Sequence, residues 1–382
     1  MLTRAGWAVA AGAITTLAVG RLLGAQELYI LATMAGALLA LALAWVRRPS
    51  TIPVLERHLR PDRPMAGSPA RVEVLASGHG RRKTAAATVV DQVAGTVGAR
   101  LLLGPIAPDA VHRVGYRLPT SQRGPLTVGP LDVEVSDPFG LARRRWRQGG
   151  PVQITVLPAV EALMGTPVGV GGDEQVAAGV AQRGAARTIA DLATLRPYVV
   201  GDDLRRVHWP TSARVDDLVV RRDEERPQGQ VSVLLDTGEW ASAAAFEQAV
   251  SAAATLVHAT AQADDRIRLQ TTSGFDSGAL EARHSEGALL ETLAHLRCGE
   301  SGPVGSPLES PRRGTLVVLV EADGTGAEPQ DRGNVRTVVV RFGGVLDQRM
   351  VPAAAGPTTV QVPAATSFAA AWRAAGLLGA PR

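Results

Sequence analysis

Two apolar stretches near the N-terminus constrain this chain more than any other feature. Residues 5–20 contain no charged side chain, and residues 28–46 again contain none. As a helix, the second stretch would be about 28 Å long, close to the roughly 30 Å thickness of the hydrocarbon core of a bilayer. The first stretch reaches this length if it continues past Arg21, whose side chain can extend to the membrane surface. The pattern therefore predicts a transmembrane helical hairpin over residues 1–48.

A signal peptide followed by a single anchor is the alternative to two spanning helices. We disfavour it because Leu23-Gly24-Ala25 is a poor match to a small-x-small cleavage site. The connection between the two stretches carries one Arg and one Glu, whereas several arginines follow the second stretch. The positive-inside rule then places both termini in the cytoplasm. The expectation is a two-helix protein of the cell membrane, with the lipid bilayer as one partner.

The residue inventory removes several common classes of enzyme. The only lysine is Lys83 and the only cysteine is Cys298, so a Walker A loop, an intramolecular disulfide and a zinc ribbon are excluded. No serine lies in a G-x-S-x-G motif. The net charge of +4 is small for 382 residues, which makes nucleic acid an unexpected partner. No cofactor is expected, and a non-enzymatic role is favoured.

Residues 49–163 are predicted to form a small all-β, sandwich-like domain. Apolar and polar side chains alternate in several short segments, for example over 131–136, and such alternation is typical of strands with one buried face. The arginine-rich run 143–147 contains Trp146. It can be a strand with outward arginines and one inward tryptophan, which we favour, or a docking patch for anionic lipid or an acidic partner.

The C-terminal part of the chain alternates strand and helix patterns. Residues 164–195 are rich in glycine and alanine, which predicts a linker. From 229 to 382, nearly continuous apolar strands such as 230–236 alternate with amphipathic helices such as 241–263. This order is typical of a doubly wound α/β domain, whose mainly parallel sheet is covered on both faces.

A distinctive segment, residues 196–228, lies between the linker and the α/β domain. From Arg196 to Arg214 it reads RPYVVGDDLRRVHWPTSAR, and Asp-Pro-Phe-Gly-Leu stands upstream at 137–141. Together these motifs resemble the signature of the domain-of-unknown-function 58 family, membrane-anchored proteins of bacteria and archaea. The resemblance extends over nearly the whole chain. It implies a domain similar to von Willebrand factor type A and association with a MoxR-type AAA+ ATPase.

The signature supplies the candidate partner-binding residues. They are Arg196, Tyr198, Gly201, Asp202, Asp203, Arg205, Arg206, Trp209, Ser212 and Arg214. His208 stands where the family commonly has an acid, and Pro210 stands where a lysine is usual. Whether the signature arginines bind a partner or hold the fold together is left open, because paired arginine clusters serve both uses.

The local chemistry of the signature predicts a short helix. Asp202 or Asp203 can cap a helix that starts at Leu204, with Arg205 and Trp209 on one face of it. Pro210 should end or kink this helix because it lacks an amide hydrogen. At a domain junction, the large apolar side chain of Trp209 is expected to be mostly buried.

The resemblance to von Willebrand factor type A domains also implies a metal site, which needs a D-x-S-x-S motif after the first strand. Asp236 keeps the acid of this motif, but Gly238 and Trp240 replace both serines. Asp323 could stand nearby after a later strand. Without the serine hydroxyls, Mg²⁺ would have too few oxygen ligands. We therefore expect a degenerate site that does not function.

The sequence favours a membrane-tethered, non-enzymatic adaptor or assembly protein that docks a cytoplasmic MoxR-type AAA+ ATPase or a membrane partner. The ATPase enters through the family resemblance alone. The alternative is a hydrolase or transferase with its active site at the Arg/Asp signature, residues 196–214. Membrane-proximal binding of nucleic acid is a weaker alternative, because the chain has few aromatic residues for base stacking.

Overall fold

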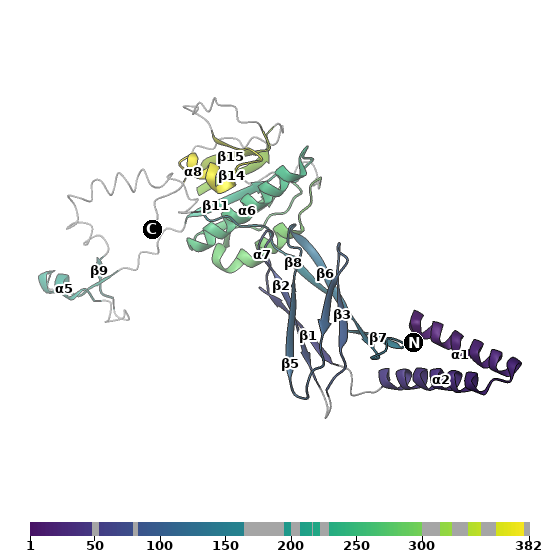
Figure 1. The fold of residues 1–382 in the computed structure, drawn as a ribbon. Coiled ribbons are helices and arrows are strands. Elements are labelled where there is room, and N and C mark those ends of the chain that lie inside the picture. Colours follow the sequence, from purple (N-terminus) through teal and green to yellow (C-terminus); the bar gives the residue numbers. More distant parts are fainter. Residues whose placement is uncertain are drawn as a thin grey trace. The chain divides into compact units, whose positions relative to one another are not determined.

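The chain divides into two units, Met1–Leu157 and Pro158–Arg382, which are described one at a time. The computed structural model (Figure 1) describes residues 1–47, 53–78, 83–163, 195–199, 207–215, 217–221, 229–299, 314–322, 335–344 and 357–377. The predicted linker at 164–195 lies outside these residues except for its last position.

Two long helices open the first unit. Helix α1 (Arg4–Leu23) is capped by Thr3, whose hydroxyl accepts a hydrogen bond from the Gly6 amide, and it ends at Gly24 with a positive φ of 66°. Helix α2 (Gln26–Val46) follows almost directly. Both are long and apolar enough to cross a membrane. The prediction of two adjacent apolar helices is confirmed.

Two antiparallel sheets form the β-domain of the first unit. One sheet has the strand order β1 (Val54–Arg60), β2 (Arg71–Ser77) and β5 (Val111–Arg117). The other has the order β4 (Ala99–Leu103), β3 (Ala87–Val93), β6 (Gly124–Ser136) and β7 (Arg143–Gln148), and β8 (Val152–Val156) pairs with the first half of β6. Alternation predicts this all-β organisation correctly, because each strand turns one face inward.

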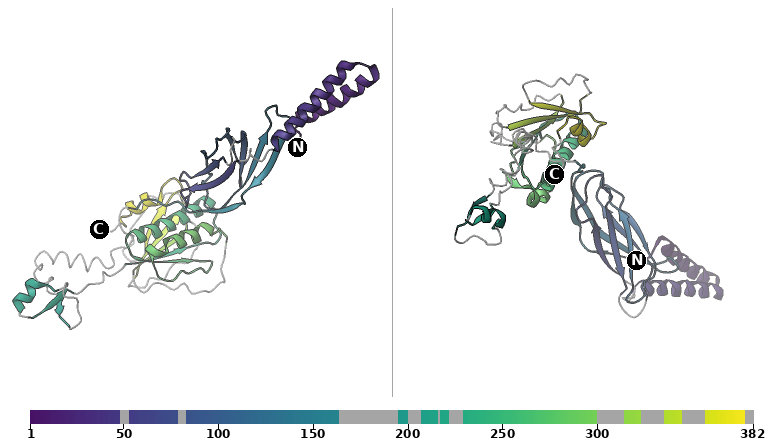
Figure 2. Two further views of the ribbon diagram at one scale, coloured as in Figure 1. Left: turned by 90° about the horizontal axis from the view of Figure 1, so that it is seen from below. Right: turned by 90° about the vertical axis from the view of Figure 1, so that its left-hand side faces the viewer.

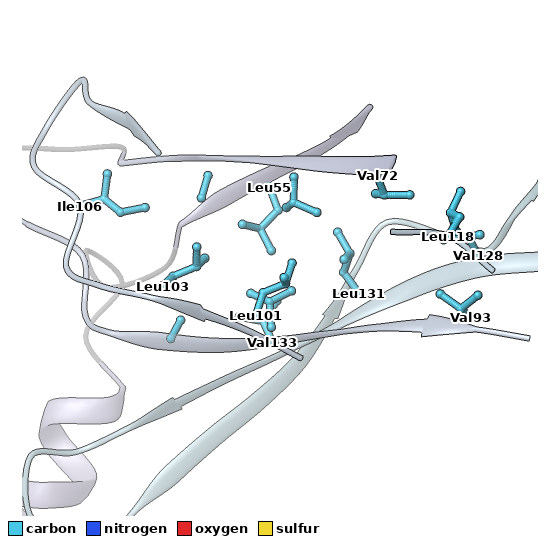
Figure 3. Close-up of a cluster of buried hydrophobic side chains, with 14 of the residues drawn as sticks. Leu55, Val72, Val93, Leu101, Leu103, Ile106, Leu118, Val128, Leu131 and Val133 are labelled. Carbon is cyan, nitrogen blue, oxygen red and sulfur yellow. The ribbon is translucent and has the colours of Figure 1, made fainter. Parts of the chain in front are cut away.

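The inner faces of the two sheets share one hydrophobic core. Leu55 and Val72 come from the first sheet, and Leu101, Leu131 and Val133 come from the second (Figure 3). Burying side chains of this size contributes about 1.5–3 kcal/mol each to folding. This core gives the β-domain a stable interior around which its polar groups are placed.

A polar network, here called the cross-sheet clip, joins the two sheets of the β-domain. Arg57 of β1 donates two hydrogen bonds to Asp91 of β3, at 2.6 and 2.9 Å. The Tyr116 hydroxyl of β5 donates a third to Asp91, at 2.7 Å. Because the Asp91 side chain is fully buried, these donors replace the water that its charge would otherwise need.

The second unit contains a six-stranded sheet. Its strand order is β13 (Leu280–Glu281), β12 (Arg266–Thr271), β11 (Gln230–Leu235), β14 (Gly314–Glu321), β15 (Val335–Phe342) and β16 (Thr358–Val362). All neighbouring pairs are parallel except β12 with β13. The prediction of a mainly parallel sheet is confirmed. The patterns missed the short strands β13 and β16.

Three described helices accompany this sheet: α6 (Ala243–Gln262), α7 (Ala282–His295) and α8 (Phe368–Ala374). Helix α6 contacts both α7 and α8, so the three lie together on one face of the sheet; α6 and α7 are the green helices in Figure 2. Side chains of both sheet faces are nevertheless buried, including Leu235 on one face and Leu234 on the other. Helices on both faces, as a doubly wound fold requires, stay a prediction.

The boundary between the units falls a few residues before the one that alternation suggested. Glu161, which we expected in the β-domain, belongs to the second unit. Its carboxylate accepts hydrogen bonds from the amides of Phe368 and Ala369 at the start of α8. A carboxylate at this position is favourable because the first amides of a helix have no partner within the helix.

Candidate functional site

Part of the signature segment forms a small folded element. Strand β9 (Leu195–Pro197) pairs antiparallel with β10 (Val219–Arg221), and helix α5 (Trp209–Val215) lies between them in sequence. Five candidate residues lie outside the described residues: Gly201, Asp202, Asp203, Arg205 and Arg206. The same is true of the side chain of Arg196.

The predicted helix from Leu204 through Trp209 is wrong. Val207 forms an antiparallel bridge with Val220, and the His208 amide donates a hydrogen bond to the Val219 carbonyl at 2.8 Å. The backbone is thus extended at Val207, and the described helix begins only at Trp209.

Pro210 starts a helix instead of ending one. It is the second residue of α5, where an amide hydrogen has no acceptor within the helix. The missing hydrogen therefore costs nothing at this position. The sequence alone did not distinguish the two ends, because proline is compatible with the first turn of a helix and also with the residues after its end.

Ser212 ties α5 to β10. Its side chain is buried, and its hydroxyl accepts a hydrogen bond from the Val219 amide at 3.0 Å. The His208 ring contacts the Thr211 hydroxyl at 2.9 Å on the first turn of the helix. The Tyr198 amide donates to the Leu218 carbonyl. Ser212 therefore serves the local fold directly.

Trp209 is 63% exposed, which corrects the expectation of burial. Among the described side chains of β9, β10, α5 and the two residues before α5, the buried apolar ones are Val207 and Val220. An element of two short strands and a seven-residue helix offers little volume to enclose an indole ring. Arg214, near the end of the same helix, is also exposed.

Asp236, the other candidate, lies at the carboxyl edge of the parallel sheet. In the strand order, β11 is followed by its neighbour β12 on one side, and β14 by its neighbour β15 on the other side. In open α/β sheets, ligands usually bind at the carboxyl edge where the strand order reverses in this way. One oxygen of Asp236, Oδ1, accepts hydrogen bonds from the Gly238 amide at 3.0 Å and the Thr272 hydroxyl at 2.9 Å. The Thr272 hydroxyl in turn accepts from the Thr237 amide at 2.8 Å. These bonds join the ends of β11 and β12.

A second acid, Glu321, closes the same edge. At the end of β14 its carboxylate accepts hydrogen bonds from the amides of Ala241 and Ser242, at the start of α6. The Trp240 indole donates to the Asp236 carbonyl and packs against Phe246. Both carboxylates are thus used to hold the loop between β11 and α6.

These residues do not fit a magnesium site. Among the described residues, no group of three His, Cys, Asp or Glu side chains could hold a metal ion. Oδ1 of Asp236 already accepts two hydrogen bonds, and the hydroxyls of Thr237 and Thr272 contact each other at 3.2 Å. Asp323 lies outside the described residues. The described part of this edge is therefore a structural lock.

Comparison with known proteins identifies the region that contains both candidates. Residues 194–350 match the family described as "Protein of unknown function DUF58". This part of the chain belongs to the DUF58 family. It begins just before β9 and includes the signature, Asp236 and the strands β11 to β15.

Two further comparisons, with curated proteins and with solved structures, do not extend this family assignment. No curated protein matches the chain. Among solved structures, the CARDB domain of the PF1109 protein from Pyrococcus furiosus, crystallised with di-metal ions, is 15% identical. The match covers 27% of this chain and 86% of that chain, with a TM-score of 0.20.

Sequence reasoning missed two important side chains of the DUF58 region. Thr272 supplies a hydroxyl to Asp236 from the end of a neighbouring strand, a residue the local D-x-S-x-S pattern does not include. Glu321 binds the backbone just before α6 from a position 80 residues away in sequence. The available signal was positional: both lie at the carboxyl ends of parallel strands, which meet at one edge of a sheet.

Proposed function

We propose that this protein is a membrane-tethered, non-enzymatic adaptor. In this proposal the N-terminal hairpin lies in the cell membrane, and the DUF58 region docks a MoxR-type AAA+ ATPase on the cytoplasmic side. The observation that carries the proposal is the exposure of Trp209 in the middle of the signature. The identity of the partner comes from the family resemblance.

The platform beneath Trp209 supports a docking role. Helix α5 is joined to β10 through Ser212, and its first turn is held by the contact between His208 and Thr211. An aromatic side chain on a fixed backbone loses little conformational entropy when a partner covers it. Tryptophan and arginine are also the residue types that most often dominate binding energy at protein interfaces. Arg214, near the other end of the same helix, is also exposed.

The rest of the chain is consistent with a tethered adaptor. Two apolar helices provide a membrane anchor, and the arginines that follow the second helix favour cytoplasmic termini. We take the mainly parallel sheet of the second unit as a von Willebrand factor A-like domain, as the family resemblance implies.

The docking proposal is tested with the full chain, purified in detergent and immobilised. We expect it to retain a purified MoxR-type ATPase from the same organism, and Trp209→Ala to reduce retention by about tenfold or more. Leu102→Ala is the matched control, because Leu102 is a similarly exposed apolar residue of β4 in the other unit. Equal retention by Trp209→Ala and the parent, or none by the parent, contradicts the proposal.

The tether is tested separately by a reporter fused after Arg382. The reporter should be active only when it is of the type that works in the cytoplasm. Activity of an exported reporter at this end contradicts the proposed topology.

A further inference from the structure

We propose that the turn between β6 and β7, residues 137–140, contacts an anionic membrane surface and inserts Phe139 into it. This inference rests on the membrane location of the hairpin in the proposed function. It adds a second membrane contact, made by the β-domain, and gives the DPFG motif a role.

The chain just before α1 is joined directly to this turn and to the two residues that follow it. Leu2 forms an antiparallel bridge with Ala142, and the Thr3 amide donates a hydrogen bond to the Leu141 carbonyl at 2.9 Å. The Thr3 hydroxyl donates to the Gly140 carbonyl at 2.6 Å. Since α1 begins at the next residue, no free linker separates the helix from the turn (Figure 1).

Both helices of the hairpin pack against the same residues. A side chain at Gly6 of α1 would place its Cβ 2.1 Å from the Leu141 carbonyl oxygen, so only glycine allows this approach. Ala42 and Val46, near the end of α2, form a buried cluster with Leu141 and Ala142. If the hairpin spans the bilayer, these two helix ends lie at one membrane surface, and the turn must lie there as well.

The turn is built to hold Phe139 outward. Asp137 is buried; its carboxylate accepts hydrogen bonds from the amides of Phe139 at 2.8 Å and Ala142 at 2.5 Å. The Gly140 amide donates to the Asp137 carbonyl at 3.0 Å, and Gly140 has a φ of 68°. Asp, Pro and Gly at these turn positions are a typical combination for a tight turn. Phe139 remains 64% exposed on this fixed backbone.

The strand that follows the exposed phenylalanine carries an excess of positive charge. In the ribbon formed by β6 and β7, the four arginines of β7 outnumber the two carboxylates of β6. Arg145 and Arg147 pair with Glu134 and Asp132, while the exposed Arg144 lies 5.9 Å from the centre of the Trp146 ring. The exposed Arg4 and Arg47 add charge at the two helix ends.

An anionic bilayer is the occupant that this combination fits. An apolar tip flanked by cations matches an interface in which aromatic rings lie at the headgroup level and anionic lipids attract arginine. The hairpin joined to this turn also carries exposed apolar side chains, including Trp7, which is 66% exposed one turn into α1. The same helices that would cross the bilayer thus bring the turn to its surface.

The chain has a single cysteine, Cys298, so replacing it allows a label to be attached at one chosen position. In a Cys298→Ser background, a nitroxide label at Phe139→Cys is compared with labels at Met34→Cys and Val97→Cys, using the full chain in phosphatidylcholine–phosphatidylglycerol vesicles. Met34 is an exposed residue of α2. Val97 is fully exposed at the opposite end of the second sheet, where the β3–β4 turn lies beside the first half of β6. For each label, the ratio of its accessibility to oxygen and its accessibility to a water-soluble nickel complex reports how deeply the label lies in the bilayer.

We expect the relative oxygen accessibility at 139 to exceed that at 97 by about threefold, with residue 34 higher still. A water-like value at 34 overturns the membrane location itself. A lipid-like value at 34 with a water-like value at 139 overturns only the present inference.

The charge requirement has its own measurement. Replacing phosphatidylglycerol by phosphatidylcholine, or raising the salt concentration, should lower the oxygen accessibility at 139 because both weaken attraction to the arginines. An Arg144→Gln variant should show part of this loss without any change of lipid. An unchanged value at 139 in neutral vesicles overturns the role given to the arginines.

Discussion

Two arginine–aspartate pairs, one in each unit, have nearly the same geometry and very different surroundings. Arg57 binds Asp91 through two hydrogen bonds of 2.6 and 2.9 Å, and Arg268 binds Asp276 through two of 2.5 and 2.9 Å. Both arginine side chains are 14% exposed. The carboxylates differ, because Asp91 is 0% exposed and Asp276 is 36% exposed.

The comparison separates the effect of burial from the effect of geometry. Water can replace the partner of Asp276, whereas the charge of Asp91 depends entirely on Arg57 and Tyr116. A buried pair of this kind contributes little net stability relative to an apolar pair, but losing one partner is costly. An exposed pair contributes little net stability, and losing one of its partners also costs little. The first unit therefore relies on one clip between its sheets, and the second unit uses its pair to hold a local turn beside β12.

The largest expected effect is at Asp91. Asp91→Ala removes the carboxylate that neutralises Arg57 and leaves the arginine charge unpaired in a mostly buried site. We expect this to lower the free energy of unfolding of the β-domain by about 3–5 kcal/mol. Hydrogen exchange of peptides from β1 and β3, in the purified full chain, measures this as a lower opening free energy. Peptides from β11 and β14 should be unaffected.

The double variant Arg57→Met with Asp91→Leu is the control for this prediction. Replacing both charges by apolar side chains removes the clip without leaving an unpaired charge, so it should destabilise less than Asp91→Ala. A double variant less stable than the single one would contradict the view that the cost comes from the unpaired charge.

Tyr116 should have the next largest effect, and it gives the clip a pH dependence. Burial, followed by the hydrogen bond to Asp91, raises the pKa of Tyr116 well above that of an ordinary tyrosine. The folded chain therefore holds this proton more tightly than the unfolded chain. The resulting stability is complete below about pH 10, the unfolded pKa, and is lost as the pH rises toward the folded pKa.

Two measurements check the role of Tyr116. Tyr116→Phe should cost about 1.5–3 kcal/mol at pH 8, the usual range for a hydrogen bond to a charged group, and the decline of stability above pH 10 should become shallower. In an ultraviolet titration of the native chain, one of the three tyrosines should resist ionisation until the protein unfolds. Free titration of all three in the native state contradicts this assignment.

Asp236 tests a carboxylate whose described hydrogen bonds come from one amide and one hydroxyl and not from an arginine. Asp236→Ala removes the acceptor of two hydrogen bonds at the sheet edge and should cost about 1–2 kcal/mol, measured by exchange of β11 peptides. Thr272→Val, which keeps the shape and loses the hydroxyl, should reproduce part of this loss. Millimolar Mg²⁺ should leave the exchange unchanged. Protection by Mg²⁺ that disappears in Asp236→Ala would reveal a cation site and contradict the structural lock.

The sequence predicts strands and apolar helices better than it predicts these polar networks. Alternation reveals strands such as β6 because burial of one face leaves a period of two in the local sequence. The cross-sheet clip has no such signal, since Arg57 and Asp91 lie on strands of different sheets and 34 positions apart. Nothing local distinguishes them from the many surface charges of the chain.

The signature shows the same limit at shorter range. Pro210 is compatible with the beginning of a helix and also with its end, and only the pairing of Val207 with Val220 decides between them. The exposure of Trp209 likewise depends on how much structure surrounds a short helix. The DPFG motif was visible in the sequence, but its position beside α1 depends on backbone hydrogen bonds between residues far apart in the chain.

The smallest effect should come from Asp276, the exposed counterpart of Asp91. Hydrogen bonding from Arg268 lowers the pKa of Asp276, so the folded chain binds fewer protons there than the unfolded chain. The stabilisation is present above the ordinary aspartate pKa of about 4 and is lost as the pH falls through the lower folded value. Solvent screening should limit the cost of Asp276→Asn at pH 6 to less than about 1 kcal/mol. Exchange of β12 peptides at pH 6 and pH 3 should show the variant and parent converging in acid. A loss as large as that of Asp91→Ala would mean that geometry, and not burial, determines how much each pair matters.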